Sequence, residues 1–150
     1  MDAEDSRFWG PATSMLSRSI HVIDQRVYRG MNARLAPYHL SQQQAIIVCF
    51  LKEHESKPVY QKDLEHEMGL TNPTVTAMIK SMMANDVVYK IKDKADGRFY
   101  QLKLTPHGIE LYEPAKAALM STNAAFEDKL SPEELVELER LLGKVLEENE

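Results

Sequence analysis

The hydrophobic pattern of this chain changes its period just after residue 83, and this change most restricts the possible folds. Before it, in LTNPTVTAMIKSMM at 70–83, apolar residues recur at the spacing of a helix, at Val75, Met78, Ile79 and Met82. After it, VVYKIK at 87–92 and FYQLKLT at 99–105 alternate in the way of strands, on either side of the turn sequence DKADG. The pattern therefore predicts a helix followed directly by a β-hairpin.

The predicted helix spans about 73–84 and has an unusual outer face. Asn72 is the predicted N-cap, and Pro73 suits the first helical position because the amide proton that it lacks would have no helical partner there. The face opposite the apolar stripe is small, carries hydroxyl groups and is nearly free of acid; it comprises Pro73, Thr74, Thr76, Ala77, Lys80, Ser81 and Ala84. Such a face allows close approach to another molecule.

The part of the chain before this helix is predicted to be mainly helical. A long first helix over about 8–35 carries one apolar stripe, formed by Leu16, Ile20, Ile23, Val27 and Met31. A capping box at Ser41 and Gln44 opens a second helix, which should be central and buried because its run AIIVCFL is apolar nearly all round. QKDLEHEM at 61–68 is predicted to be a short third helix that ends at Gly69.

Two further helices are predicted after the hairpin. Thr105 and Pro106 cap and begin the first of them, and Pro114 should kink it. Its small residues would let another helix approach closely, at Ala115, Ala118, Thr122 and Ala125. A second capping box, Ser131–Glu134, opens the last helix, whose apolar stripe is Leu135, Leu138, Leu142 and Val145.

Two short helices joined by a tight turn and followed by a two-stranded hairpin form a winged helix-turn-helix. In this motif the second helix of the pair enters a major groove of DNA, and the hairpin, or wing, reaches the flanking minor groove or backbone. The predicted fold is mainly α with a small β-hairpin wing. A winged helix used only for protein contacts is the alternative. We predict one domain over 1–150, with a winged-helix core at about 38–106, dimerisation helices at about 8–35 and 106–148, a recognition helix at about 73–84 and a wing at about 87–104.

Charge is distributed unevenly along the chain. The net charge is -5, but residues 71–106 carry +3, from six basic residues against three acidic ones, whereas residues 131–150 carry -5. The basic region coincides with the predicted recognition helix and wing, which favours a nucleic-acid partner. Lysines that only solvate a strand surface would give the same pattern.

Other functional classes have little support in the sequence. The five histidines include no pair at metal-ligand spacing, and Glu65, His66 and Glu67 point in different directions on a helix, so we predict no metal, no cofactor and no enzyme activity. Cys49 lies in an apolar run and is predicted to be a buried structural thiol. No apolar run approaches the roughly 20 residues of a membrane span, and the start MDAEDSRFW is unlike a secretory signal, so we predict a cytoplasmic protein without a membrane partner.

Several short motifs together resemble the MarR family of transcriptional regulators. The most specific is Asp-x-Arg followed by Leu-Thr-x-x-Gly, and the resemblance covers nearly the whole chain because the long outer helices also fit. The motifs are Leu40–Ser41 before the second helix, Thr74–Val75–Thr76 in the fourth, Val87–Val88 entering a strand, Asp96–Gly97–Arg98 at the turn, and Leu104–Thr105–Pro106–His107–Gly108 after it.

The resemblance implies a bacterial or archaeal homodimer that binds a pseudo-palindromic operator in double-stranded DNA, usually as a repressor that a small-molecule effector releases. It also implies that Arg98 lies at the wing tip near the minor groove, with Asp96 orienting it; residues two apart in an extended strand share a face. With the outer helix face, the predicted DNA contacts are Asn72, Pro73, Thr74, Thr76, Ala77, Lys80, Ser81, Lys94 and Arg98. No motif marks the effector pocket; Trp9, Tyr28 and Tyr38 could line it or belong to the core.

A few residues depart from the family pattern. Asn85–Asp86 replaces a glycine at the end of the recognition helix, and both residues tolerate left-handed geometry. Lys90 and Gly97 stand where arginine is common, and fewer bidentate donors predict weaker or more salt-sensitive binding. Tyr60 and Glu65 replace small or hydroxyl residues around the third helix. A further alternative is a regulator of the same fold that responds to a metal ion or to oxidation instead of to a small-molecule effector.

Overall fold

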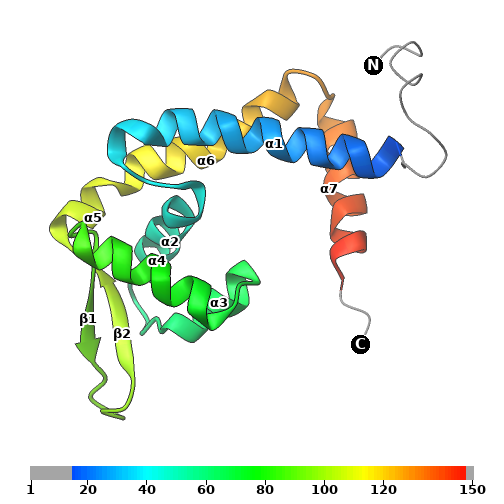
Figure 1. The fold of residues 1–150 in the computed structure, drawn as a ribbon. Coiled ribbons are helices and arrows are strands. Elements are labelled where there is room, and N and C mark those ends of the chain that lie inside the picture. The colour runs from blue at the N-terminus through cyan, green and yellow to red at the C-terminus, as the bar shows by residue number, and fades with distance from the viewer. Residues whose placement is uncertain (1–14, 148–150) are drawn as a thin grey trace.

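The computed structural model describes residues 15–147 and consists mainly of helices with one β-hairpin (Figure 1). The predicted fold class is confirmed. The predicted first-helix residues 8–14 and Trp9 lie outside the described residues. The elements are α1 (Met15–Leu35), the 3-10 helix η2 (Ala36–Tyr38), α2 (Gln42–Glu53), α3 (Gln61–Met68), α4 (Asn72–Ala84), β1 (Val88–Lys92), β2 (Tyr100–Leu104), α5 (Pro106–Glu110), α6 (Tyr112–Glu127) and α7 (Pro132–Leu146).

The core forms around α2, as its apolar sequence predicts. The capping box is present, with the Ser41 hydroxyl accepting from the Gln44 amide and the Gln44 side chain accepting from the Ser41 amide. Five side chains of the helix are buried: Ala45, Ile47, Val48, Cys49 and Leu51. Ala115 and Ala118 of α6 are buried as well, and these small residues let α6 lie close to α2. The other two small residues of the predicted stripe are less buried, since Thr122 is half-buried and Ala125 is exposed.

The apolar stripe of α1 is only partly covered within the chain. Met31 and Leu35, near the end of the helix, are buried in the core. Leu16, Ile20 and Ile23, nearer its beginning, are exposed, and Leu16 is 70% exposed. Helices α1 and α6 run side by side, above α2, α4 and the hairpin in the view of Figure 1. The first part of α1 therefore carries an apolar surface that no other described element covers.

The helix predicted from Pro106 onward is interrupted. It ends as α5 at Glu110 and resumes as α6 at Tyr112, so the kink predicted at Pro114 takes the form of a break at Leu111. A proline lacks the amide proton that would donate to the carbonyl four residues earlier. For Pro114 that carbonyl belongs to Glu110, the last residue of α5.

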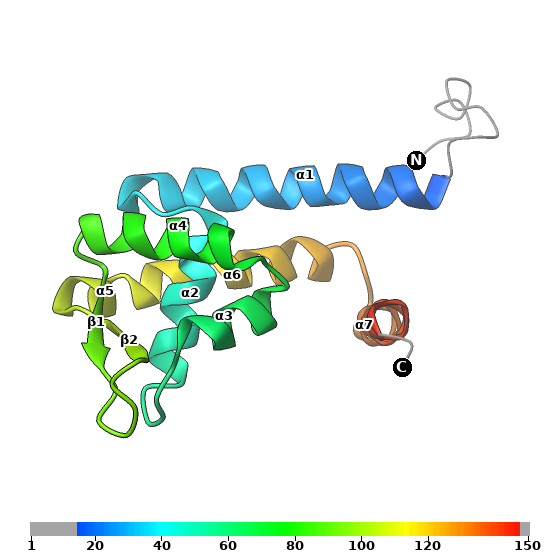
Figure 2. The ribbon, with the colours of Figure 1, turned by 60° about the horizontal axis from the view of Figure 1, so that its bottom comes forward.

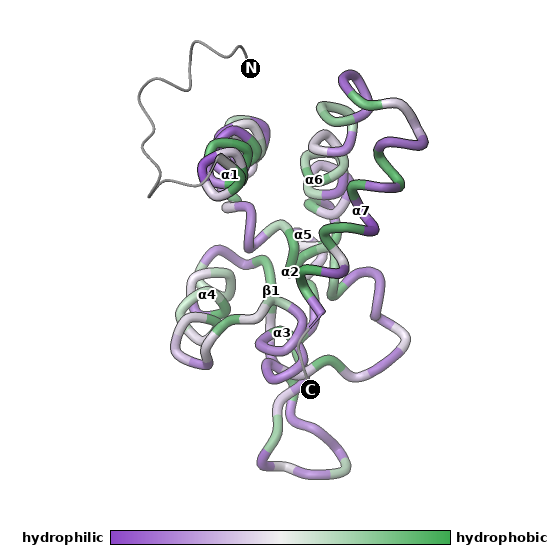
Figure 3. The backbone as a smooth tube through the Cα atoms, turned by 90° about the vertical axis from the view of Figure 1, so that its right-hand side faces the viewer, coloured by the Kyte–Doolittle hydropathy of each residue, from purple (hydrophilic) through white to green (hydrophobic). Residues whose placement is uncertain are grey.

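The last helix, α7, extends away from the other helices (Figures 1 and 2). Its capping box forms as predicted, because the Ser131 hydroxyl accepts from the Glu134 amide and the Glu134 carboxylate accepts from the Ser131 amide. Hydrophobic and hydrophilic residues alternate along it (Figure 3). Within residues 132–146, all of which are described, no side chain is buried; the exposed apolar ones are Val136, Leu141, Leu142, Val145 and Leu146.

The hairpin does not have one apolar face and one polar face. Tyr100, Leu102 and Leu104 share a side of β2, but the register pairs them with Lys92, Lys90 and Val88, and directly paired residues in an antiparallel hairpin project to the same face. Within the hairpin, only Val88 at the base and Leu102 in the middle of β2 are buried. Both faces of the wing therefore mix apolar and polar side chains, which suits an element that projects into solvent.

A hydrogen-bonded junction joins the end of α4 to α5. The Thr105 hydroxyl donates to the carbonyl of Asp86 at 2.5 Å and accepts from the amide of Gly108 at 2.9 Å. The Thr105 amide donates to the Val87 carbonyl at 3.0 Å. This junction explains the Leu-Thr-x-x-Gly motif in structural terms: the threonine caps α5 and fixes the segment that follows α4.

Candidate nucleic-acid interface

The helix pair α3 and α4 forms around a tight turn at Gly69. Gly69 has a φ of 61° and ends α3, as predicted, because glycine adopts this left-handed conformation without steric cost. The amide of the next residue, Leu70, donates to the Glu65 carbonyl at 3.1 Å. On the inner side, Leu64 of α3 and Val75 and Ile79 of α4 are buried. The second helix is thereby held against the core by one face.

The outer face of α4 is exposed, as predicted. Val75, Ile79 and Met82 point into the core, and every residue of the opposite face lies at the surface: Pro73, Thr74, Thr76, Ala77, Lys80, Ser81 and Ala84. Lys80 is the only charged residue within Asn72–Ala84, so the whole helix contains no acid. The surface that α4 presents is thus small, polar and weakly positive.

The predicted start of α4 is wrong by one residue. Thr71, and not Asn72, is the N-cap, because the Thr71 carbonyl already accepts the first helical hydrogen bond from the Val75 amide at 3.1 Å. Pro73 is then the second helical residue, whose amide would also have had no partner within the helix. The Asn72 side chain does not cap the helix, since it donates to the Glu65 carboxylate at 2.6 Å.

A hydrogen-bond network between α3 and α4 holds two predicted site residues. The Gln61 amide group donates to the Thr76 hydroxyl at 2.6 Å and to Glu65 at 3.3 Å, and the Thr76 hydroxyl lies 3.4 Å from the Asn72 side-chain oxygen. Glu65, which has no evident purpose in the sequence, is the acceptor that fixes Asn72. Sequence reasoning missed Gln61 and Glu65 because their partners lie on a different helix.

Helix α4 is followed by a left-handed residue although it lacks the usual glycine. Asp86 has a φ of 58°, and the Val87 amide donates back to the Met82 carbonyl at 2.9 Å. Aspartate adopts this conformation at lower cost than most residues, because its short side chain can bond to the local backbone. The expectation that Asn85–Asp86 preserves the turn is confirmed at Asp86.

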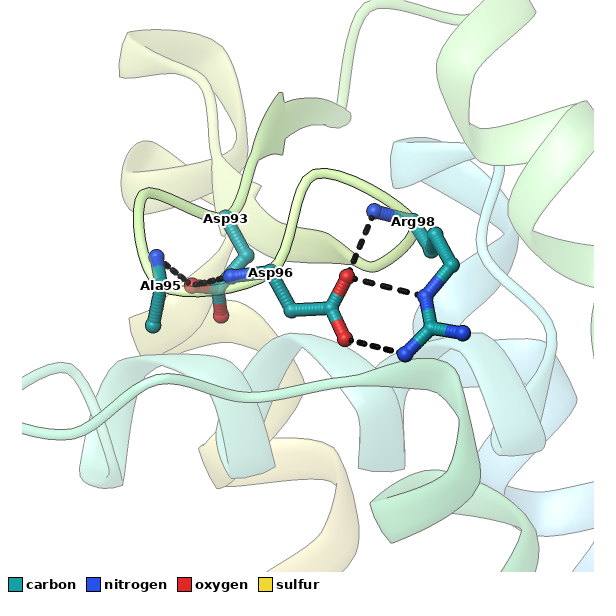
Figure 4. Close-up of polar contacts among 4 residues, drawn as sticks. All are labelled: Asp93, Ala95, Asp96 and Arg98. Carbon is teal, nitrogen blue, oxygen red and sulfur yellow. Dashed lines mark hydrogen bonds and ion pairs between the residues drawn. The ribbon is translucent and has the colours of Figure 1, made fainter.

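The wing tip holds Arg98 against Asp96. The Arg98 guanidinium donates two hydrogen bonds to the Asp96 carboxylate, from Nε to Oδ1 at 3.1 Å and from Nη2 to Oδ2 at 2.9 Å (Figure 4). This pairing holds the pKa of Asp96 below its usual range. Asp96–Gly97–Arg98 lies at the turn, as predicted, and the Phe99 amide donates to the Asp96 carbonyl at 3.1 Å, so the two side chains meet through a turn and not through the spacing of an extended strand. The Arg98 side chain is still 85% exposed, and Lys94 is exposed in the same loop.

A second contact at the wing involves Tyr60, the residue just before α3. Its hydroxyl donates to the Asp93 carboxylate, and its ring meets the ring of Phe99 edge-on at 6.3 Å. The hydrogen bond raises the pKa of Tyr60 and lowers the pKa of Asp93. Tyr60 and Asp93 are 33 residues apart, so no local pattern in the sequence connects them.

No group of three or more metal-ligating side chains occurs among residues 15–147. Cys49 is buried as predicted, and burial raises the pKa of its thiol to about 11.

A cavity of about 550 Å³ borders α1, α2 and α3 and is lined in part by Tyr28, Ser41 and Met68. Tyr38 does not line it. No helix within the described range is long and apolar enough to cross a bilayer.

Comparison with known proteins identifies the family. The model of the MarR family matches residues 40–99, which contain α2, α3, α4 and β1. The HTH-type transcriptional regulator MgrA of Staphylococcus aureus is 30% identical over 109 residues, which cover 73% of this chain and 71% of MgrA. The chain belongs to the MarR family. It is therefore a transcriptional regulator, which confirms the prediction that it is not an enzyme.

Solved MarR-family structures share the fold. S. aureus MepR in complex with DNA superposes with a TM-score of 0.84 at 22% identity, over 89% of this chain and 98% of MepR. A mutant of MarR from E. coli in complex with operator DNA gives a TM-score of 0.78 at 23% identity, over 88% of this chain and 94% of that one. MarR from Oenococcus oeni gives 0.75 at 26% identity, over 89% and 99%.

Proposed function

We propose that this MarR-family regulator binds a specific site in double-stranded DNA, with α4 in the major groove and the wing tip at the flanking minor groove or backbone. The observation that carries the proposal is the outer face of α4, which is exposed, free of acid and small enough to reach base edges. Its threonine and serine hydroxyls and Lys80 can donate to bases or phosphates. The wing projects beyond the helix pair and away from α1 (Figures 1 and 2), with Arg98 and Lys94 exposed at its tip.

The proposed binding unit is a homodimer on a pseudo-palindromic operator. The uncovered apolar stripes of α1 and α7 support this, because a second copy related by a two-fold axis would bury them. Two recognition helices would then meet half-sites about one helical turn, roughly 34 Å, apart. This arrangement makes 8–35 and 106–148 the dimerisation helices and 38–106 the DNA-binding core of one domain.

We further propose that the protein acts as a repressor and that a small molecule releases it. The cavity of about 550 Å³ supports the release by a small molecule, because residues of α1, α2 and α3 line it together. The test is a binding screen on the DNA upstream of its own gene, with random DNA of equal length as the control and candidate ligands added to the bound complex. Equal affinity for both DNAs would contradict the proposal.

The α4 hydroxyls lead to one prediction. Replacing Thr76 by valine keeps the shape of the side chain but removes the hydroxyl, and we expect a loss of about 1 to 3 kcal/mol on the cognate site if this group contacts a base. Binding to random DNA should change little. Competition between the two DNAs measures the difference, and Thr76→Ser, which keeps the hydroxyl, is the matched control. Lower folding stability with unchanged DNA preference would show that Thr76 serves only the network with Gln61.

The wing tip leads to a second prediction. Arg98→Ala should leave the fold intact, because the side chain is exposed and its hydrogen bonds go to Asp96 in the same loop. We expect it to weaken specific and non-specific binding by about tenfold, or about 1.4 kcal/mol, and to reduce the salt slope of the binding constant by about one. Arg98→Lys should restore only part of the affinity, since an ammonium group lacks the planar fork. Unchanged affinity and salt slope would show that the wing does not touch DNA.

A further inference from the structure

Tyr60 connects the helix pair to the wing through both its backbone and its side chain. Its amide donates to the Asp63 carboxylate at 2.8 Å, which fixes the start of α3. Its backbone pairs with Gln101 of β2, and the neighbouring Val59 carbonyl accepts from the Leu102 amide at 2.8 Å. The phenol hydroxyl then extends to Asp93, beyond the end of β1. One residue thus joins three parts of the DNA-binding region.

Asp93 in turn determines the shape of the wing loop. Its Oδ1 accepts from the amides of Ala95 at 2.7 Å and Asp96 at 3.4 Å, while Oδ2 accepts from the Tyr60 hydroxyl (Figure 4 shows the Asp93 contacts within the loop). Its amide donates to the Phe99 carbonyl at 2.9 Å, across the base of the loop. Asp93 therefore holds the backbone of Asp96, whose carboxylate binds Arg98. The series of contacts runs from α3 through Tyr60, Asp93 and Asp96 to the guanidinium.

We propose that Tyr60 is a positioning residue for DNA binding, which orients Arg98 by fixing the wing loop through Asp93. The inference rests on the proposed wing contact with DNA and adds the residue that prepares it. An exposed loop that is ordered before binding loses less conformational entropy when it binds. Without the phenol hydroxyl, the Asp93 carboxylate loses its link to the start of α3 and keeps only its contacts with the loop amides and the Gln101 side chain.

The structure makes Tyr60→Phe a selective test. Phenylalanine keeps the ring against Phe99 and keeps the backbone bonds to Asp63 and Gln101, so only the hydroxyl contact with Asp93 is lost. Tyr89→Phe is the matched control, since it removes a phenol oxygen from the same hairpin at an exposed position whose hydroxyl has no hydrogen-bond partner among the described residues. Both variants should unfold at the wild-type temperature within a few degrees.

The experiment measures operator binding and its salt dependence for wild type, Tyr60→Phe, Arg98→Ala and the double variant. We expect Tyr60→Phe to weaken binding about threefold to tenfold and to have little further effect once Arg98 is absent, which is the signature of coupled residues. Tyr89→Phe should bind as wild type does. In the free protein, amide hydrogen exchange at Ala95 and Asp96 should be faster in Tyr60→Phe than in wild type.

The outcomes separate this inference from the proposed function. Wild-type affinity in Arg98→Ala would overturn the wing contact with DNA, and the inference with it. If Arg98→Ala weakens binding but Tyr60→Phe does not, the wing contact stands and the positioning role is overturned. An effect of Tyr60→Phe that is equally large with and without Arg98 would also overturn it, because Tyr60 would then act by another route.

Discussion

Ending the chain after Leu130 is expected to abolish the proposed dimer and to lower operator affinity by about two to four orders of magnitude, since two linked half-site contacts become one. The physical reason is that α7 packs little against its own chain, where Leu135 and Leu138 of its stripe are only half-buried. None of its side chains within Pro132–Leu146 is buried, and Val145 is 82% exposed. If its apolar stripe is covered by a second copy, as we propose, its removal takes that part of the interface away.

Sedimentation equilibrium measures the assembly, and titration of operator and half-operator DNA measures the binding. A point variant guards against misfolding of the truncated chain: Leu142→Glu places a charge in the stripe of α7 without shortening the chain and should also dissociate the dimer. Glu139→Gln, on the same helix, is the control for a change of charge. A truncated chain that remained a stable dimer with wild-type operator affinity would show that α7 is not part of the interface.

Gly108→Ala is expected to lower the free energy of unfolding by about 3 kcal/mol, although alanine normally favours a helix over glycine by roughly 1 kcal/mol. A Cβ at Gly108 would stand against the Val87 carbonyl oxygen, well inside van der Waals contact, and 3.1 Å from a methyl group of Leu104. The carbonyl belongs to the junction between α4 and α5 and accepts from the Thr105 amide. Neither the Val87 carbonyl nor the Gly108 backbone can move away from the added methyl group without breaking that hydrogen bond.

Urea denaturation at one fixed protein concentration measures the change. Gly143→Ala is the matched control, because it adds the same methyl group within α7 at a position where no other part of its own chain lies within 4 Å of it. That variant should gain up to roughly 1 kcal/mol. If the two variants had the same stability, the α4–α5 junction would be looser than its geometry indicates. A second expected consequence of Gly108→Ala is weaker operator binding, since α4 ends at this junction.

Most of the fold was predictable because it follows from local signals. The capping boxes at Ser41 and Ser131, the left-handed end of α3 at Gly69 and the alternating strands each depend on residues within a few positions of one another. The errors were also local and small. Helix α4 starts at Asn72 because the backbone of Thr71 accepts the first hydrogen bond, which side-chain preferences do not reveal.

The candidate site divides in the same way. The outer face of α4 follows from the helical period alone, and the pairing of Asp96 with Arg98 from their spacing, although a turn and not a strand produces it. The contacts of Glu65 with Asn72 and of Tyr60 with Asp93 could not be predicted, because they depend on how α3 lies against α4 and the wing. Tyr60 and Glu65, two of the departures from the family pattern, proved to be residues that join these elements.

The burial of Cys49 has a practical consequence for the kinetics of this protein. It is the single cysteine of the chain, it lies inside α2, and its thiol stays protonated at neutral pH because its pKa is about 11. A thiol reagent reacts with an exposed thiolate, so labelling must wait until this helix opens. The rate at which Cys49 is labelled therefore reports the rate of local unfolding in the native chain. The labelling rate would compare every variant above on one scale, and its change on adding operator DNA would measure how far binding stabilises the core.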